Sequence, residues 1–340
     1  MMTMPANAAS NAANATRTLR RTPECAAARC ALRLRTSPIT LLIVQSLTCA
    51  HPIISGMKIA VLSDIHGVLP ALQAVLADVD AWQPDAVVVN GDIVNRGPSP
   101  LACWQLLAER QRTNGWQLLR GNHEDFVINM TLPDAPQAGP QLELQLSARW
   151  TSERLKGQIA ALQALPAVVH LQDAQGGTLR FVHASMAGNR DGLHRSASNS
   201  KIRAQIEPLP GVFCTAHTHW AWTRTLDATL IVNSGSVGTP FDGDERAAYA
   251  QLTWRQPFAG GGSWRAQIVR VPYDRAQTQK DFETSGYLHE SGALTAVLHT
   301  EWRLARSLWP AWLARYEADV LAGKISAAQA AAHFLDSVAE

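Results

Sequence analysis

Residues 86–97 read Ala86-Val87-Val88-Val89-Asn90-Gly91-Asp92-Ile93-Val94-Asn95-Arg96-Gly97, an apolar run followed by a polar loop. The run from Ala86 to Val89 is typical of a buried β-strand. Asp92 comes just after the point where this strand would end. Because ligands collect at the carboxyl ends of strands in α/β sheets, Asp92 is the first candidate for chemistry.

Strand and helix patterns alternate along the chain from Met57 onward. The helical stretches show apolar residues at helical spacing, and Pro70 suits the first turn of the first helix. In chain order we expect a strand at 58–62, a helix at 70–82, a strand at 86–90, a helix at 100–112 and a strand at 116–119. This alternation favours a sheet with helices on both faces.

Further strands are expected at 178–182, 211–215, 229–232, 248–252 and 264–269. The last three are short, closely spaced and bounded by turns, so we expect them to form a second sheet. The expected fold class is therefore α/β: a two-sheet β-sandwich flanked by helices, in four layers αββα.

The chain is expected to have three parts. Residues 1–56 would be an N-terminal extension, residues 57–280 the main domain, and residues 281–340 a C-terminal helical segment. Within the main domain, a proline-rich loop and then a helical period indicate a helical insertion at 126–165 that covers one side of the site.

The C-terminal segment carries a bulky apolar stripe from Leu294 to Trp312. This stripe predicts a helix that packs on the main domain, and a partner-binding helix is the alternative. Ser326, with Gln329 three residues later, predicts a capping box at the start of a final helix.

The net charge of +2 is unevenly distributed, because residues 1–56 hold six Arg and one Glu and the remainder is therefore −3. The basic extension says little about nucleic-acid affinity of the main domain. We expect residues 1–56 to be disordered or not native, with the true start at Met57 and a cytoplasmic location. The alternative is an exported protein in which residues 1–50 are a signal peptide.

The five cysteines show irregular spacing and no CxxC pair, which favours neither a zinc ribbon nor a disulfide framework. Cys103 on an expected helix and Cys214 on an expected strand are predicted to be buried thiols.

Five sequence blocks follow expected strands: Asp64-Ile65-His66, Gly91-Asp92, Gly121-Asn122-His123-Glu124, His183, and His217-Thr218-His219. In this set and order, the sequence resembles the calcineurin-like metallophosphoesterase superfamily. Residues 91–97 and 118–124 further resemble its protein serine/threonine phosphatases, and residues 233–238 resemble its small bacterial phosphodiesterases. Ala216 stands where the family's last block usually has glycine.

The resemblance implies a metallo-dependent phosphatase-like fold with two divalent metal ions. Asp64, His66 and His219 would hold the first ion, Asn122, His183 and His217 the second, and Asp92 would bridge them. Carboxylate oxygen and imidazole nitrogen together favour Mn²⁺, with Fe, Zn²⁺ or Ni²⁺ as alternatives. By the same resemblance, His123 acts on the leaving-group oxygen as general acid or electrostatic stabiliser, and Arg96 binds the substrate phosphate.

The expected function is hydrolysis of small phosphomonoesters or phosphodiesters by attack of a metal-bound hydroxide. A phosphoprotein or dinucleoside polyphosphate phosphatase is the alternative, and a metal-free scaffold of the same fold is a third reading. A nuclease is disfavoured because the chain from residue 57 onward is mildly acidic and has no basic run. The expected partner is a small phosphorylated substrate, with neither a membrane nor nucleic acid, and the oligomeric state stays open.

Overall fold

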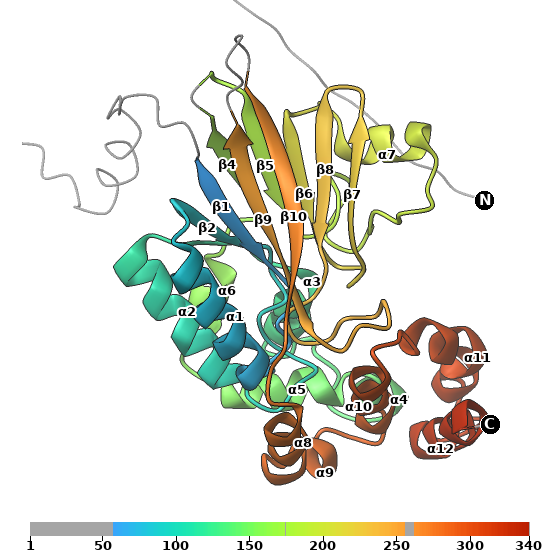
Figure 1. Cartoon of the computed structure of the whole chain (residues 1–340). Helices are drawn as coiled ribbons and strands as arrows, with labels where there is room; N and C mark the ends of the chain where they lie inside the picture. The colour runs from blue at the N-terminus through green and yellow to red at the C-terminus, as the bar shows by residue number, and fades with distance from the viewer. Residues whose placement is uncertain (1–56, 174, 256–261, 340) are drawn as a thin grey trace, which may run out of the picture. The chain divides into compact units, whose positions relative to one another are not determined.

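The structure is a computed structural model that describes residues 57–173, 175–255 and 262–339 (Figure 1). The extension expected at 1–56, together with its signal-peptide alternative, lies outside these residues. Within them, no helix combines the length and the apolar character that crossing a bilayer requires.

The first sheet is built around β1 (Lys58–Leu62), which is buried on both faces. Its side chains alternate, so that Ile59 and Val61 join the core between the sheets while Ala60 and Leu62 join the core under the helices. Strands β1, β2 and β3 run parallel, and β9 pairs antiparallel with β1. Across the sheet the order is β10 (Ser263–Val271), β9 (Ala247–Arg255), β1, β2 (Ala86–Val89) and β3 (Gln117–Leu118).

The second sheet has a parallel centre and antiparallel edges. Strands β5, β6 and β8 pair in parallel, and the two edge strands pair antiparallel with their neighbours. Across the sheet the order is β4 (Val168–Gln172), β5 (Thr178–Val182), β6 (Val212–Thr215), β8 (Thr229–Ser234) and β7 (Ala221–Leu226). The edge strands β4 and β7 were not among the expected strands.

The expectation that the strands at 229–232, 248–252 and 264–269 form one sheet is wrong. Strand β8 lies in the second sheet, whereas β9 and β10 complete the first. The reason is burial, because β9 needs cover on both faces: Tyr249 packs under the helices, and Leu252 packs between the sheets. Only a position inside the first sheet, beside β1, gives β9 packing partners on both faces.

Helices cover both outer faces of the sandwich, which confirms the predicted two-sheet αββα class. Helices α1 (Leu69–Trp82) and α2 (Pro100–Asn114) pack on the first sheet. Helix α7 (Asn199–Ile206) packs on the second through Ile202 and Ile206. Cys103 on α2 and Cys214 on β6 are buried free thiols, as expected.

The stretch after β3 is helical but broken into short pieces. Gly157, with φ +84°, lies between two of the helices and interrupts the helical backbone. The pieces are α3 (Asn122–Asn129), α4 (Pro140–Glu143), α5 (Leu146–Arg154) and α6 (Ile159–Gln163).

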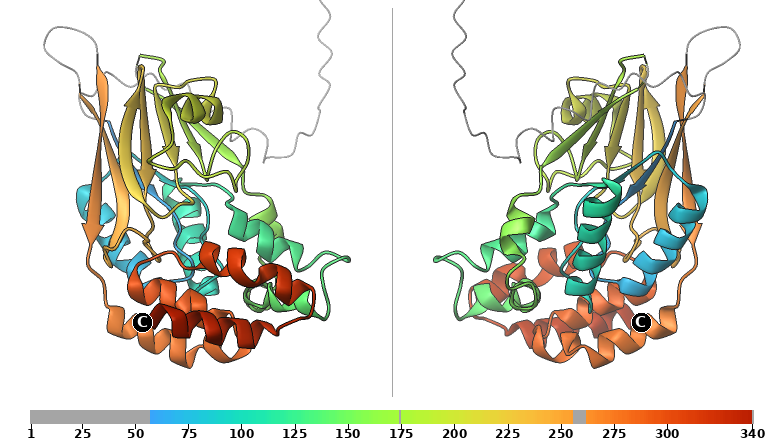
Figure 2. Two further views of the ribbon diagram at one scale, coloured as in Figure 1. Left: turned by 90° about the vertical axis from the view of Figure 1, so that its right-hand side faces the viewer. Right: turned by 90° about the vertical axis from the view of Figure 1, so that its left-hand side faces the viewer.

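Five helices follow β10 and gather at one end of the sandwich (Figures 1 and 2). The apolar stripe predicted as one helix is divided between two, because the chain leaves the helical conformation at Ala305, with φ +47°. The predicted capping box is confirmed: Ser326 Oγ accepts the Gln329 N–H at 3.1 Å, and Gln329 Oε1 accepts the Ser326 N–H at 3.2 Å. The helices are α8 (Arg275–Thr284), α9 (Tyr287–Glu290), α10 (Thr295–Leu304), α11 (Trp309–Leu321) and α12 (Ala327–Ala339).

Candidate metal centre

The candidate residues lie in the loops that follow five strands. Because the strands of each parallel set end on the same side, their loops meet there. In chain order the residues are Asp64 and His66 after β1, Asp92 after β2, Asn122 and His123 at the start of α3 after β3, His183 after β5, and His217 and His219 after β6.

One group of ligand atoms comes from Asp64, His66 and His219, which are all buried and lie within 4.8 Å of one another. His219 Nδ1 lies 2.6 Å from the carbonyl oxygen of Thr239, which can only accept. The Nε2 lone pair of neutral His219 therefore faces inward, 3.1 Å from His66 Nε2 and 3.3 Å from Asp64 Oδ1. Two imidazole nitrogens and a carboxylate oxygen thus converge on one point.

A second group comes from Asp92, His183, His217 and Asn122. His183 Nδ1 lies 2.8 Å from the carbonyl oxygen of Asn90, so its Nε2 also faces inward. That Nε2 lies 3.1 Å from Asp92 Oδ2 and 2.9 Å from Asn122 Oδ1. His217 Nδ1 lies 2.8 Å from the same Asn122 oxygen.

Asp92 lies between the two groups. Its Oδ2 is 3.8 Å from His66 Nε2 in the first group and 3.1 Å from His183 Nε2 in the second. The structure therefore brings together all seven side chains that the resemblance selects as ligands, with the carboxylate of Asp92 shared.

The electrostatics suit cation binding. Burial, with neighbouring histidines, lowers the pKa of His66 well below its ordinary value, and burial with His183 lowers that of His217 to about 4. Burial alone would lower the pKa of His183, but the Asp92 carboxylate outweighs burial and raises this pKa to about 10. Carboxylate oxygens and imidazole nitrogens converge here, and either a proton on His183 or a metal ion relieves the repulsion between their lone pairs.

A metal ion fits this donor set. Within the described part of the chain, the buried Asp64 Oδ1 has no hydrogen-bond partner, a costly state for a carboxylate oxygen. Two imidazoles whose tautomers are fixed by backbone carbonyls point their free nitrogens at carboxylates, as metal ligands do. The Asp and His clusters therefore fit a divalent metal site.

Backbone strain is concentrated in these loops. Ten described non-glycine residues have positive φ, a conformation that persists only where surrounding contacts enforce it. Seven of the ten belong to the site: Asp64, His66, Asp92, Asn95, Arg96, His217 and His219.

Two neighbours of Asp92 hold it in place, and the sequence reasoning assigned neither a role. The buried carboxylate of Glu124 accepts the backbone N–H groups of Asp92, Ile93 and Gly121 at 2.8 Å and of Val94 at 3.2 Å. Burial and the nearby Asp92 carboxylate raise the pKa of Glu124 to about 7. At Gly121, a Cβ would lie 2.2 Å from Asp92 Oδ1, so only glycine fits. In the sequence, Glu124 could have been noticed because it directly follows Asn122 and His123 in the third of the five blocks.

His123 lies between the candidate metal ligands and a pocket. Its ring centroid is 4.8 Å from that of His66, and one of its nitrogens lies within 4.8 Å of ligand atoms of His66 and Asp92. Its Nδ1 lies 2.9 Å from Asn95 Nδ2. Burial lowers the pKa of His123 well below its ordinary value.

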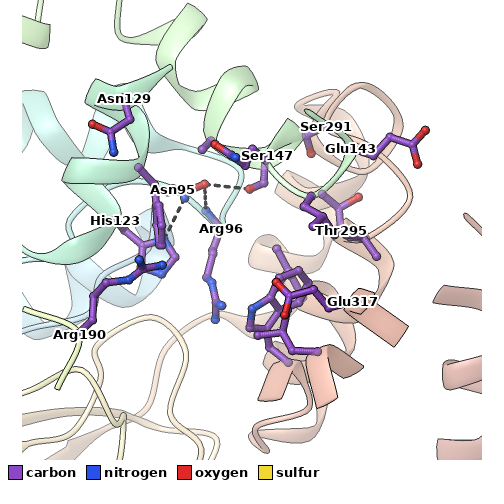
Figure 3. A pocket seen from close by; sticks show the side chains of 18 residues that line it. Asn95, Arg96, His123, Asn129, Glu143, Ser147, Arg190, Ser291, Thr295 and Glu317 are labelled. Carbon is purple, nitrogen blue, oxygen red and sulfur yellow. Dashed lines mark hydrogen bonds between the residues drawn. The ribbon is translucent and has the colours of Figure 1, made fainter. Parts of the chain in front are cut away.

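Asn95 determines which His123 nitrogen carries the proton (Figure 3). Asn95 Oδ1 accepts the Arg96 N–H and the Ser147 hydroxyl, each at 2.8 Å. Because a backbone N–H can only donate, the atom facing His123 is the Asn95 amide nitrogen, which donates to Nδ1. Neutral His123 therefore carries its proton on Nε2.

The pocket has a volume of about 400 Å³ and begins at His123. Arg96 and Arg190 lie beside His123 at this end (Figure 3). Arg96, the expected phosphate ligand, lies 3.4 Å from Glu301 Oε2, and Arg190 stands over the Phe126 ring at 4.6 Å.

The sequence of these blocks matches a known family. Residues 57–221 match the family model for calcineurin-like phosphoesterases. The chain belongs to the calcineurin-like metallophosphoesterase superfamily. The match ends at β7, so α8–α12 lie beyond it.

Relatives of this superfamily member include solved structures. A metallophosphoesterase from Sphaerobacter thermophilus is 25% identical, with a TM-score of 0.54 over 74% of this chain and 99% of that one. Hypothetical protein PH1004 from Pyrococcus horikoshii is 19% identical, with a TM-score of 0.58 over 70% of this chain and 97% of that one, and it shares the fold. The uncharacterized protein MJ0912 from Methanocaldococcus jannaschii is 25% identical over 64% of this chain and 88% of its own length.

Ala216, which replaces the usual glycine of the superfamily's last block, fits its place. It is buried, its N–H donates to the His183 carbonyl at 2.8 Å, and it is not among the described residues with positive φ. No left-handed backbone is needed here, so the alanine methyl group leaves His217 and His219 in position.

Proposed function

We propose that this chain is a dinuclear metal-dependent phosphoesterase that hydrolyses small phosphomonoesters or phosphodiesters. The observation that carries the proposal is the convergence of two groups of ligand atoms on Asp92. Asp64, His66 and His219 would hold one ion, and Asn122, His183 and His217 the other. The mixture of carboxylate, amide and imidazole donors favours Mn²⁺, with Fe, Zn²⁺ or Ni²⁺ as alternatives.

Several groups around the candidate metal centre would act on a bound phosphoester. Bound metal ions would supply Lewis acidity toward the phosphoryl oxygens. Arg96 and Arg190 line the pocket together with His123 and would orient the phosphoryl group. The Nε2–H of neutral His123 would donate a hydrogen bond to the leaving-group oxygen as negative charge develops there.

A small substrate is favoured because the pocket next to His123 is bounded on its far side by the C-terminal helices. A volume of about 400 Å³ suits a compact ligand.

The test uses the full chain. Metal content after Mn²⁺ loading and hydrolysis of p-nitrophenyl phosphate and bis-p-nitrophenyl phosphate are measured for the wild type, Asp92→Asn and the control His170→Gln, whose histidine lies exposed on β4. We expect about two ions per chain and turnover, both lost in Asp92→Asn and kept in His170→Gln. A wild type that binds no transition metal would favour the scaffold reading instead.

A further inference from the structure

Seven of the eighteen residues that line the pocket come from the C-terminal segment, beyond the residues that match the family model. The reacting end, with His123, Arg96 and Arg190, belongs to the main domain. The opposite wall is formed by residues from the end of α9 to the middle of α11: Ser291, Leu294, Thr295, Leu298, Trp309, Leu313 and Glu317.

This opposite wall is mainly apolar near Arg96. Leu294, Leu298, Trp309 and Leu313 face the pocket, and Phe126 faces it from the main domain. The Trp309 ring stacks on the fully buried Trp312 at 5.2 Å but is itself only partly buried. An aromatic ring left partly uncovered inside a concave pocket is a surface on which a flat apolar group can pack.

Charge is also divided along the pocket. Arg96 and Arg190 lie at the reacting end, whereas Glu143 and Glu317 lie on the far side (Figure 3). These carboxylates would repel a leaving group that carries a second negative charge, so the pocket disfavours such a group.

One buried carboxylate links the two ends. Glu301, which is 2% exposed, accepts the N–H groups of Leu308 and Trp309 through Oε1, each at 2.7 Å. Its Oε2 lies 3.4 Å from the Arg96 guanidinium. Glu301 therefore holds both the first residue of α11 and the expected phosphate ligand, so the apolar wall has a fixed position relative to the reacting end.

We propose that helices α10 and α11 form the leaving-group subsite, and that it takes phosphoesters of flat, apolar alcohols without a second negative charge, such as aryl alcohols. This inference rests on the proposed function for the reaction, but the packing that it requires can be measured without turnover. A phosphoserine side chain would leave Trp309 and the leucines uncovered, so phosphoproteins fit this subsite less well.

The test is binding of two non-hydrolysable ligands, 1-naphthylphosphonate and methylphosphonate, to the Mn²⁺-loaded full chain by calorimetry. We expect Trp309→Ala to weaken the naphthyl ligand about 10-fold or more and the methyl ligand hardly at all. Leu313→Asn, which changes the wall without removing Trp309, should act in the same direction. The matched control Trp82→Ala removes a half-buried tryptophan at the end of α1, outside the pocket, and should change neither affinity.

Glu317→Gln tests the charge argument with a third ligand, 4-carboxyphenylphosphonate. Its affinity should rise in this variant, while that of 1-naphthylphosphonate stays the same. Equal weakening of the naphthyl and methyl ligands by Trp309→Ala, or a wild type that binds both equally, would overturn the subsite. If 1-naphthylphosphonate binds as expected but no phosphoester is hydrolysed, the proposed function fails and the subsite stands.

Discussion

Asn95 Nδ2 lies 2.9 Å from His123 Nδ1, and the orientation of the Asn95 amide is set by two donors on its oxygen. This contact joins the loop after β2 to the first turn of α3. It leaves His123 with a proton on Nε2, where a leaving-group oxygen can use it.

Replacing Asn95 tests this relationship. In Asn95→Asp, the carboxylate still accepts from Arg96 and Ser147, but it can also accept a proton-bearing Nδ1, so it favours protonated His123 and raises its pKa. We expect the inflection of the kcat profile that reports His123 to move to higher pH, with metal content unchanged. Asn95→Ala should lower kcat about 10-fold or more. An unchanged pH profile in Asn95→Asp would show that Asn95 does not position His123.

His123→Ala should separate catalysis from metal binding. We expect the variant to keep its metal ions and to lose about 10²–10⁴ in kcat, most for esters with poor leaving groups. The measurement is metal content by elemental analysis beside rates for aryl esters of differing leaving-group pKa. Because a nitrogen of His123 lies near ligand atoms of His66 and Asp92, loss of metal in this variant would assign His123 to the ligands instead.

Glu124→Gln should destabilise the loop that carries Asp92. The four backbone N–H groups around Glu124 need acceptors, and an amide offers one oxygen while its NH₂ group faces buried donors. We expect a loss of about 1–3 kcal/mol in the free energy of unfolding and weaker metal binding. Urea denaturation measures it, with Glu109→Gln as the control, because Glu109 pairs with Arg112 on the exposed surface. Equal effects of the two substitutions would contradict this role.

The stability of the metal-free protein should fall as pH rises from about 6.5 to about 10. The folded protein holds a proton on His183 up to a pKa of about 10, whereas an unfolded histidine releases it near 6.5. The stabilisation is therefore complete below the unfolded pKa and is lost as pH rises through the folded one. A bound metal ion replaces this proton, so the loaded protein should keep its stability over this range.

Urea midpoints across this range, with EDTA or with Mn²⁺, check the expectation. A metal-free protein whose midpoint stays level between these pH values would contradict the role of the His183–Asp92 pair.

The elements whose cause is local could be predicted from the sequence. The strands at 58–62 and 86–90 and the helix at 70–82 follow from apolar spacing over a few residues, and the structure has them within one or two residues of the expected ends. The candidate ligands could be selected because five blocks follow expected strands in the order that carried the resemblance. The capping box of Ser326 and Gln329 is equally local.

The remaining features depend on contacts between residues far apart in the chain, which no local pattern encodes. Strand β9 belongs to the first sheet because β1 is the partner that leaves both of its faces buried. Arg96 and Glu301 are separated by 205 positions, and through this pair α10 and α11 come to face His123. Local periodicity sets which residues form strands, helices and loops, whereas the packing of distant segments sets which of them share a site.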